Sequence, residues 1–403
     1  MSVATTTSPP RLIWHEADSE ELISAAKTLP LLKAAVAVAG DRADLKLQLA
    51  RTLFRTDQMA EIVDWLRPIV DQNDGDPELL YHLGRAALAT GDWQTALDAL
   101  SLAAKSGFRG ALGWTAPALA RLQRADEAIE VAVQALEDPT PDFRPLVLLA
   151  RLLPSRGDTE RLWLLCVGLR ARGFWGGYLP AVSAFAAAAM QYNEEVAALL
   201  NPARWFSAMR LGLRNNFNEN LSAELLANRN LSSVHSLKAT RGDGAWVEDL
   251  HNFGGPLAKE LLAECRRSVT DYVAQRELFA EDAIMMHRPG HVKLSSWAAL
   301  VHGDGHQHWH IHPEGWISGV YYVDLPKLEC ADRGREGDIE FGVFPFHDDI
   351  PNLEDHCWRI RPEAGTLLLF PSYYAHRTWP TNVSDWRLSI AFDVVPAMPA
   401  NEA

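Results

Sequence analysis

The chain has 403 residues, of which 48% are hydrophobic, and its formal net charge at pH 7 is −14. At about 100–200 residues per domain, this length predicts two or three domains. The acidic balance argues against nucleic acids and anionic membranes as partners, because both recruit proteins through an excess of Lys and Arg.

Residues 1–20 are expected to form a flexible N-terminus, because Met1–Arg11 is rich in Ser, Thr and Pro. This segment lacks the apolar stretch of a signal peptide, and no run of 18 or more apolar residues occurs in the sequence. The four cysteines are widely spaced, without a C-x-x-C pair. We therefore expect a soluble protein of the reducing cytoplasm, without a disulfide framework.

Residues 21–227 are rich in Ala and Leu, show almost no strand pattern and contain an internal repeat. In one copy, a helical apolar pattern runs over Leu80–Ala103 around a turn at Thr90-Gly91-Asp92. Similar patterns precede and follow it at a period of about 34 residues. The spacing resembles that of tetratricopeptide repeats, in which small residues let two antiparallel helices approach closely. The prediction is an α-helical solenoid that docks a peptide or protein, with a plain helical bundle as the alternative.

After Asn228-Arg229-Asn230 the composition changes, and residues 228–403 are expected to form a second domain. A helical pattern covers Pro256–Leu278, and from Ala283 onward the apolar residues follow a period of two. The expected strands are Lys293–Val301, His306–His312, Ser318–Val323, Asp338–Gly342, Trp358–Ile360, Gly365–Phe370 and Arg387–Val394. They predict a sandwich or barrel such as a double-stranded β-helix (a jelly roll) over residues 283–396, and hence an α+β multidomain chain.

Four histidines alternate within a short segment, at His306, His308, His310 and His312. On a strand, alternate side chains face the same side, so this row is expected to point several imidazoles to one surface. Each buried imidazole needs partners for two nitrogens, which makes such a row poor core packing and a good metal site. A solvent-facing polar strand is the alternative.

The sequence around these histidines resembles a known family. Pro313 follows His312, the run Ser318-Gly319-Val320-Tyr321-Tyr322-Val323 comes next, and His376 lies beyond the apolar strand Leu367–Phe370. This order resembles the 2-oxoglutarate/Fe(II) oxygenases that carry an H-x-H-P…S-G-V-Y-Y-V signature and often follow tetratricopeptide repeats. The architecture is also similar to that of the aspartyl/asparaginyl β-hydroxylases.

The resemblance implies a non-haem iron centre with positions left open for a keto acid and dioxygen. It places the first ligand at His310 and the distal ligand at His376. His312 stands where most such enzymes carry Asp, so three ligand sets remain open. The metal is bound by all three histidines, by His310 and His376 alone, or by these two with a carboxylate such as Asp304 or Glu314. A site with two histidines would also admit a halide.

The resemblance also implies a site for 2-oxoglutarate. Arg387 lies on the strand after His376, and its guanidinium is suited to bind the distal carboxylate of the keto acid bidentately. Ser389 shares the same strand face, and Tyr322 is a further candidate for a hydrogen bond to the keto acid. Candidates for contacts around the metal or with the substrate, with core packing or exposure as the alternative, are His306, His308, Trp316 and Tyr321.

The implied activity is that of a dioxygenase using Fe(II), 2-oxoglutarate and O2. It would hydroxylate an unactivated C–H bond of a peptide, protein or small molecule and convert 2-oxoglutarate to succinate and CO2. No catalytic residue beyond the metal and cosubstrate ligands is expected. Two alternatives remain: a non-catalytic scaffold that retains the metal, and a cupin-like metal enzyme that does not use 2-oxoglutarate. Whether Arg387 points at the metal-bound cosubstrate distinguishes the oxygenase from the cupin-like enzyme, and the presence of Arg387 and His376 argues against the scaffold.

Overall fold

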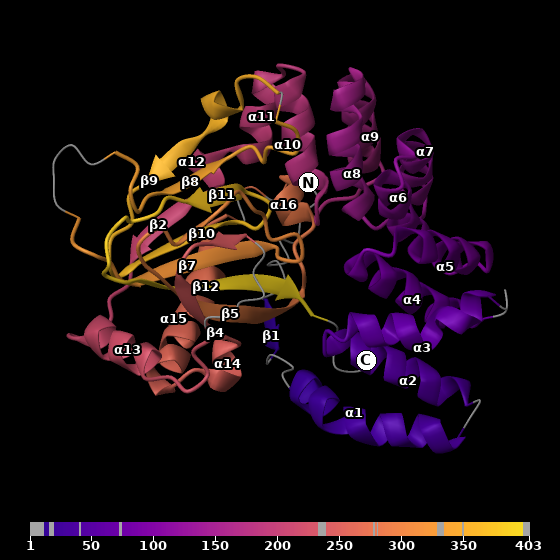
Figure 1. Cartoon of the computed structure of the whole chain (residues 1–403). Helices are drawn as coiled ribbons and strands as arrows, with labels where there is room; N and C mark the ends of the chain where they lie inside the picture. The colour runs from indigo at the N-terminus through magenta and orange to yellow at the C-terminus, as the bar shows by residue number, and fades with distance from the viewer. Residues whose placement is uncertain are drawn as a thin grey trace, which may run out of the picture. The chain divides into compact units, whose positions relative to one another are not determined.

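The computed structural model describes residues 12–15, 20–39, 42–71, 75–232, 239–276, 279, 281–328, 334–348 and 350–397. Contacts divide the chain into two compact units, one of residues 18–162 and one of residues 1–17 and 163–403 (Figure 1). We call them the helical unit and the sheet unit. Residues 163–227, which the sequence assigned to the helical domain, belong to the sheet unit. Most of the predicted flexible segment 1–20 lies outside the described residues.

The helical unit is a series of helices in which each packs against the next. They are α1 (Glu20–Ala39), α2 (Ala43–Arg55), α3 (Met59–Asp71), α4 (Pro77–Thr90), α5 (Trp93–Lys105), α6 (Ala111–Arg121), α7 (Ala125–Ala135) and α8 (Arg144–Leu152), followed by the 3-10 helix η1 (Pro154–Arg156). Helix α9 (Thr159–Ala171) then crosses the division between the units. Among the described residues, no helix combines the length and apolarity that crossing a membrane requires.

The repeat pattern corresponds to helix ends and to close helix packing. Gly91 ends α4 in the left-handed conformation, and the Asp92 side chain accepts a hydrogen bond from the Thr95 backbone to begin α5. A Cβ on Gly84 would lie 2.4 Å from Cγ of Leu100. Glycine at this position therefore permits the close approach of α4 and α5 that the small-residue spacing predicts.

The sheet unit contains a seven-stranded sheet of order β1-β5-β12-β7-β10-β2, with β4 also paired to β5, and a three-stranded sheet of order β11-β8-β9. The large sheet consists of β1 (Ile13–His15), β2 (Ser207–Arg210), β4 (Gly244–Glu248), β5 (His291–Val301), β7 (Ile317–Asp324), β10 (Thr366–Pro371) and β12 (Arg387–Pro396). The small sheet consists of β8 (Ile339–Gly342), β9 (Trp358–Ile360) and β11 (Ala375–Thr378). A separate pair is formed by β3 (Thr240–Arg241) and β6 (His306–Gln307).

Both sheets contribute side chains to one cavity, as expected for the predicted double-stranded β-helix. Strand β12 is antiparallel to both of its neighbours, β5 and β7, which explains why it is buried along most of its length. Two helices of the unit, α13 (Phe217–Leu226) and α14 (Leu250–Phe253), pack against β7 and β5. The large sheet is thus covered by helices (Figure 1) and lines the cavity with its other face.

Further helices complete the sheet unit. They are α10 (Leu179–Ala189), α11 (Asn193–Leu200), α12 (Pro202–Trp205), α15 (Pro256–Ala274), α16 (Ala283–Met286) and the 3-10 helix η3 (Leu353–His356). Strand β2 pairs with β10, and the Tyr373 hydroxyl donates to the Leu199 carbonyl at 2.6 Å. These contacts explain why the segment after Leu162 belongs to the sheet unit.

The predicted strand His306–His312 is wrong as a continuous strand. Only His306–Gln307 is strand, in β6, and His310 forms an isolated bridge with His376. The backbone of this segment changes partner along its length: the N–H of His308 donates to Ala239, and that of His310 donates to His376. The four imidazoles therefore do not share one face, because no single neighbouring strand holds the segment extended.

Candidate metal centre

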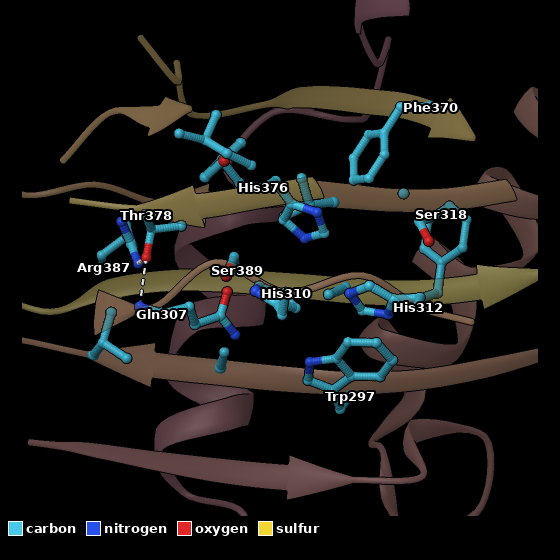
Figure 2. Close-up of a pocket in the computed structure, with 18 residues that line it drawn as sticks. Trp297, Gln307, His310, His312, Ser318, Phe370, His376, Thr378, Arg387 and Ser389 are labelled. Atoms are coloured by element: carbon cyan, nitrogen blue, oxygen red, sulfur yellow. Dashed lines mark hydrogen bonds between the residues drawn. The ribbon is translucent and has the colours of Figure 1, made fainter. Parts of the chain in front are cut away.

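Three histidines come together in the cavity between the sheets (Figure 2). Each of His310, His312 and His376 offers a ligand atom, and these atoms all lie within 4.8 Å of one another. His376 lies on β11, and its backbone exchanges two hydrogen bonds of 3.0 Å with His310. Two residues on, the backbone N–H of His312 donates to the Ser372 carbonyl at 2.9 Å. Backbone pairing thus brings together histidines that are distant in sequence.

Each of the three imidazoles has an acceptor for its Nδ1 atom. Nδ1 of His310 lies 2.7 Å from the His308 carbonyl, and Nδ1 of His376 lies 3.0 Å from the Tyr374 carbonyl. Nδ1 of His312 lies 2.7 Å from Oδ2 of Asp393. Carbonyl and carboxylate oxygens accept hydrogen bonds, which assigns the proton of each neutral ring to Nδ1. The Nε2 lone pair of each ring is then available to a metal.

Burial keeps two of these rings neutral. Desolvation, reinforced by the neighbouring His312, lowers the pKa of His310 to about 3. Desolvation, together with His310, holds the pKa of His376 well below its ordinary value. Neutral imidazole is the form that binds metal, and a set of three histidine donors fits Fe(II) and other divalent first-row metals.

The two carboxylates considered as additional ligands lie elsewhere. Neither Asp304 nor Glu314 belongs to the ligand group, and both are exposed. Oδ1 of Asp304 lies 3.4 Å from the backbone nitrogen of Asp243, which donates to it. Among the described residues, the ligand group is therefore formed by histidines alone.

Contacts on several sides fix the ring of His312. It stacks on the indole of Trp297, with ring centroids 5.6 Å apart and planes inclined by 10°. On its other side it stacks on His376, at 5.2 Å and 11°. Asp393, which accepts from its Nδ1, also accepts from the Ser318 hydroxyl at 2.6 Å. The sequence did not identify three of these contact residues, Trp297, Ser318 and Asp393. Asp393 lies on the same face of β12 as Arg387 and Ser389.

Arg387 is a buried cation in the same cavity. Its side chain is 4% exposed, and Nη2 donates to the Thr378 hydroxyl at 3.0 Å. It forms no ion pair with any described Asp or Glu. Burial lowers its pKa, and Tyr322 opposes that shift. A buried guanidinium without a carboxylate is costly, so the cavity is suited to an anionic ligand.

Two further candidate residues line the cavity with Arg387. Tyr322 and Ser389 do so from adjacent strands, where they are paired in register. Burial raises the pKa of Tyr322 to about 12, which keeps its hydroxyl protonated and able to donate. Figure 2 shows Arg387 and Thr378 at one end of the cavity and His312 at the other. Gln307 and Thr378 also line it and were not identified from the sequence.

The remaining candidates lie outside the cavity lining. The Tyr321 hydroxyl donates to Asn218 at 2.6 Å, because Tyr321 faces the opposite side of β7 from Tyr322. The indole N–H of Trp316 donates to the Ile284 carbonyl at 2.9 Å. The rings of His306 and His308 contact each other, with centroids 5.0 Å apart, and neither lines the cavity.

A family model matches the part of the chain that carries this site. Residues 295–393 match the family described as "Putative 2OG-Fe(II) oxygenase". This span contains the three histidines and Arg387, and the match confirms the predicted resemblance. A comparison with curated proteins finds no match.

Several solved structures show distant similarity to this chain. A prolyl-4-hydroxylase of Pseudomonas putida is 16% identical, with 49% of this chain and 96% of that chain covered and a TM-score of 0.33. HygX of Streptomyces hygroscopicus, with nickel and 2-oxoglutarate bound, is 13% identical, with 49% and 85% covered and a TM-score of 0.32. A 2OG-Fe(II) oxygenase family oxidoreductase of Burkholderia pseudomallei is 13% identical, with 52% and 94% covered and a TM-score of 0.32.

Proposed function

We propose that the chain is a 2-oxoglutarate- and Fe(II)-dependent oxygenase, because residues 295–393 match the model of that family, and that it hydroxylates an unactivated C–H bond of its substrate. In this reaction one atom of O2 enters the substrate and the other enters succinate, as 2-oxoglutarate loses CO2. One observation carries the proposal: the buried Arg387, without an acidic partner among the described residues, lines the same cavity as three histidines with free Nε2 atoms.

Of the three possible ligand sets, we propose the one with His310, His312 and His376. If His310, His312 and His376 held Fe(II) together, they would leave it room for a chelating keto acid and for dioxygen. No position then remains for a halide, which supports hydroxylation over halogenation. Bound Fe(II) supplies the redox chemistry of dioxygen activation, and the three rings fix where that chemistry takes place.

Arg387 is proposed to bind the distal carboxylate of 2-oxoglutarate. Its guanidinium is already oriented by the hydroxyl of Thr378, so little side-chain entropy remains to be lost on binding. The hydroxyls of Ser389 and Tyr322 are proposed to donate hydrogen bonds to the same ligand. Because Arg387 and Tyr322 are almost fully buried, these interactions act in a site from which water is largely excluded.

A substrate-recruiting role is proposed for the helical unit. Its helices α2, α4 and α6 present aromatic side chains around one cation, with the Arg85 guanidinium 4.0 Å from the ring centroid of Phe54 and 4.8 Å from that of Trp114. Both rings are only partly buried. Aromatic and Arg side chains are the residues most often found at the centre of protein interfaces. This favours a peptide or protein substrate over a small molecule.

The test of the proposed reaction is succinate formation under 18O2. Full-length protein with Fe(II) and 2-oxoglutarate is expected to release CO2 and to place one 18O atom in succinate, slowly when no substrate is present. The Arg387→Ala variant is expected to require far more 2-oxoglutarate. A non-catalytic scaffold would form no succinate, and a cupin-like enzyme without keto-acid chemistry would leave 2-oxoglutarate unchanged, so either result contradicts the proposal.

A further inference from the structure

One of the three histidines has a different kind of partner from the others. His310 and His376 direct Nδ1 at main-chain carbonyls, whereas His312 directs it at the carboxylate of Asp393. The side chains of His312 and Asp393 are each 13% exposed. A hydrogen bond to a carboxylate is stronger than one to a carbonyl, and it increases the basicity of the ring nitrogen that faces a metal.

The carboxylate of Asp393 is itself held in place. Oδ1 accepts from the Ser318 hydroxyl at 2.6 Å, and that hydroxyl lies 2.8 Å from the hydroxyl of Ser372. Ser318 is on β7 and Asp393 on β12, where the two residues are paired in register. The backbone carbonyl of Ser372 accepts from the backbone of His312. The same small network therefore holds both the ring and its acceptor.

A carboxylate usually stands among the metal ligands of such centres, as the third member beside two histidines. In this chain the third position carries the imidazole of His312, and the carboxylate of Asp393 is hydrogen-bonded to Nδ1 of that ring. We propose that His312 and Asp393 act as one unit. His312 binds the metal through Nε2, and Asp393 is a positioning residue. Its carboxylate acts on the metal through the imidazole and so supplies the negative charge that a carboxylate ligand would carry. This inference rests on the proposed function, because it concerns the same metal.

Titration of the metal-free, full-length protein with Co(II) tests the inference without requiring turnover. The Asp393→Asn variant keeps an oxygen acceptor but removes the charge, and Asp393→Ala removes both. Each is expected to weaken Co(II) binding by about 10- to 100-fold, as losses of such outer partners typically do. The matched control is Asp324→Asn, the same change at an exposed position of β7, which should leave the affinity unchanged.

A double-variant cycle separates positioning from simple stability. If Asp393 acts through His312, then adding Asp393→Asn to His312→Ala causes no further loss of Co(II) affinity. An equal loss in both backgrounds, or wild-type affinity of Asp393→Asn, overturns the inference. Melting temperatures of the metal-free variants verify folding. Should both Asp393 variants fail to fold, Ser318→Ala removes the donor that holds Asp393 and is expected to weaken Co(II) binding in the same direction.

The proposed function can be contradicted independently of the inference about Asp393. If the wild-type protein binds Co(II) and 2-oxoglutarate leaves the cobalt spectrum unchanged at every concentration, the keto-acid proposal is wrong, while the Asp393 cycle still decides the inference. Conversely, a 2-oxoglutarate-dependent spectral change together with wild-type Co(II) affinity in Asp393→Asn retains the proposed function and rejects the unit of His312 and Asp393.

Discussion

The backbones of His310 and His376 exchange two hydrogen bonds of 3.0 Å each, outside any longer ladder of strand pairing. This single bridge places their rings with centroids 4.1 Å apart. Since both side chains also direct Nδ1 at a carbonyl two residues earlier in the chain, the two rings present Nε2 in equivalent ways. Backbone pairing thus sets the relative position of the two rings.

Removing the Arg387 guanidinium is expected to weaken the binding of 2-oxoglutarate and to leave metal binding unchanged. Hydrogen bonds to charged groups contribute about 1.5–3 kcal/mol, so Arg387→Ala should raise the KM for 2-oxoglutarate by about 10- to 100-fold. The comparison variant is Arg359→Ala, which removes a partly exposed arginine of β9 that does not line the cavity. Steady-state succinate formation measures both. Equal KM values for Arg387→Ala and the wild type would show that the keto acid binds elsewhere.

Two adjacent tyrosines should behave differently because they face opposite sides of β7. Tyr322→Phe removes a hydroxyl from the cavity and is expected to weaken 2-oxoglutarate binding. Tyr321→Phe removes the hydrogen bond to Asn218 and is expected to cost about 1 kcal/mol of stability without changing the KM. Kinetics and urea unfolding of the two variants provide the measurement. A larger kinetic effect at Tyr321 than at Tyr322 would contradict the assigned orientation.

Acid should destabilise the metal-free sheet unit. Burial lowers the pKa of His310 to about 3 and that of His376 well below its usual value, whereas an unfolded chain titrates its histidines near about 6.5. Between these values the unfolded state binds more protons. Stability is therefore complete above about pH 6.5 and is lost as the pH falls toward 3. Urea unfolding in the presence of a chelator at pH 7 and pH 5 measures the loss.

A variant with a neutral side chain in place of one histidine provides the control for this pH dependence. His376→Gln has no imidazole to protonate at that position, so its stability should fall less steeply between pH 7 and pH 5. Identical slopes in the wild type and the variant would mean that the buried ring of His376 does not determine the acid sensitivity.

In the helical unit, adding a single methyl group at Gly84 is expected to push α4 away from α5. A Cβ at Gly84 meets Leu100 at 2.4 Å, and overpacking of this kind costs about 1–3 kcal/mol. Gly168→Ala is the matched control in helix α9: its Cβ meets nothing within 4 Å, so it should be neutral or gain up to about 1 kcal/mol. Urea unfolding followed by circular dichroism measures both variants. A Gly84→Ala variant as stable as the wild type would contradict the close packing.

Much of the fold could be predicted because the periodic spacing of apolar residues is visible in a single sequence. The period-two segments near β5, β7, β10 and β12 were found to within a few residues, since each buries alternate or continuous apolar side chains. Strand β11, which carries His376, was missed, because Ala375–Thr378 is short and has no apolar alternation. The division at Leu162 was also not predicted, since helices that pack on a sheet have the same composition as helices of a repeat.

The candidate site was predicted in part. The resemblance pointed to His310, His312, His376 and Arg387, and the structure brings all four to one cavity. Simple alternation failed for His306 and His308, because it assumes a continuous strand and the segment changes backbone partner between His308 and His310. Asp393 had a usable signal, as a charged residue on the same strand face as Arg387. For Trp297, a lone aromatic residue in an apolar strand, the sequence offered no such signal.

The central claim is that three histidines bind Fe(II) in the cavity where Arg387 binds 2-oxoglutarate. The visible absorption spectrum of the anaerobic protein with both ligands tests it most directly, because a keto acid chelated to Fe(II) gives a weak charge-transfer band. We expect the band in the wild type, its loss in His310→Ala, His312→Ala and His376→Ala, and its appearance only at much higher 2-oxoglutarate in Arg387→Ala. A wild-type protein without the band at saturating keto acid, or a His312→Ala variant with an unchanged band, would contradict the claim.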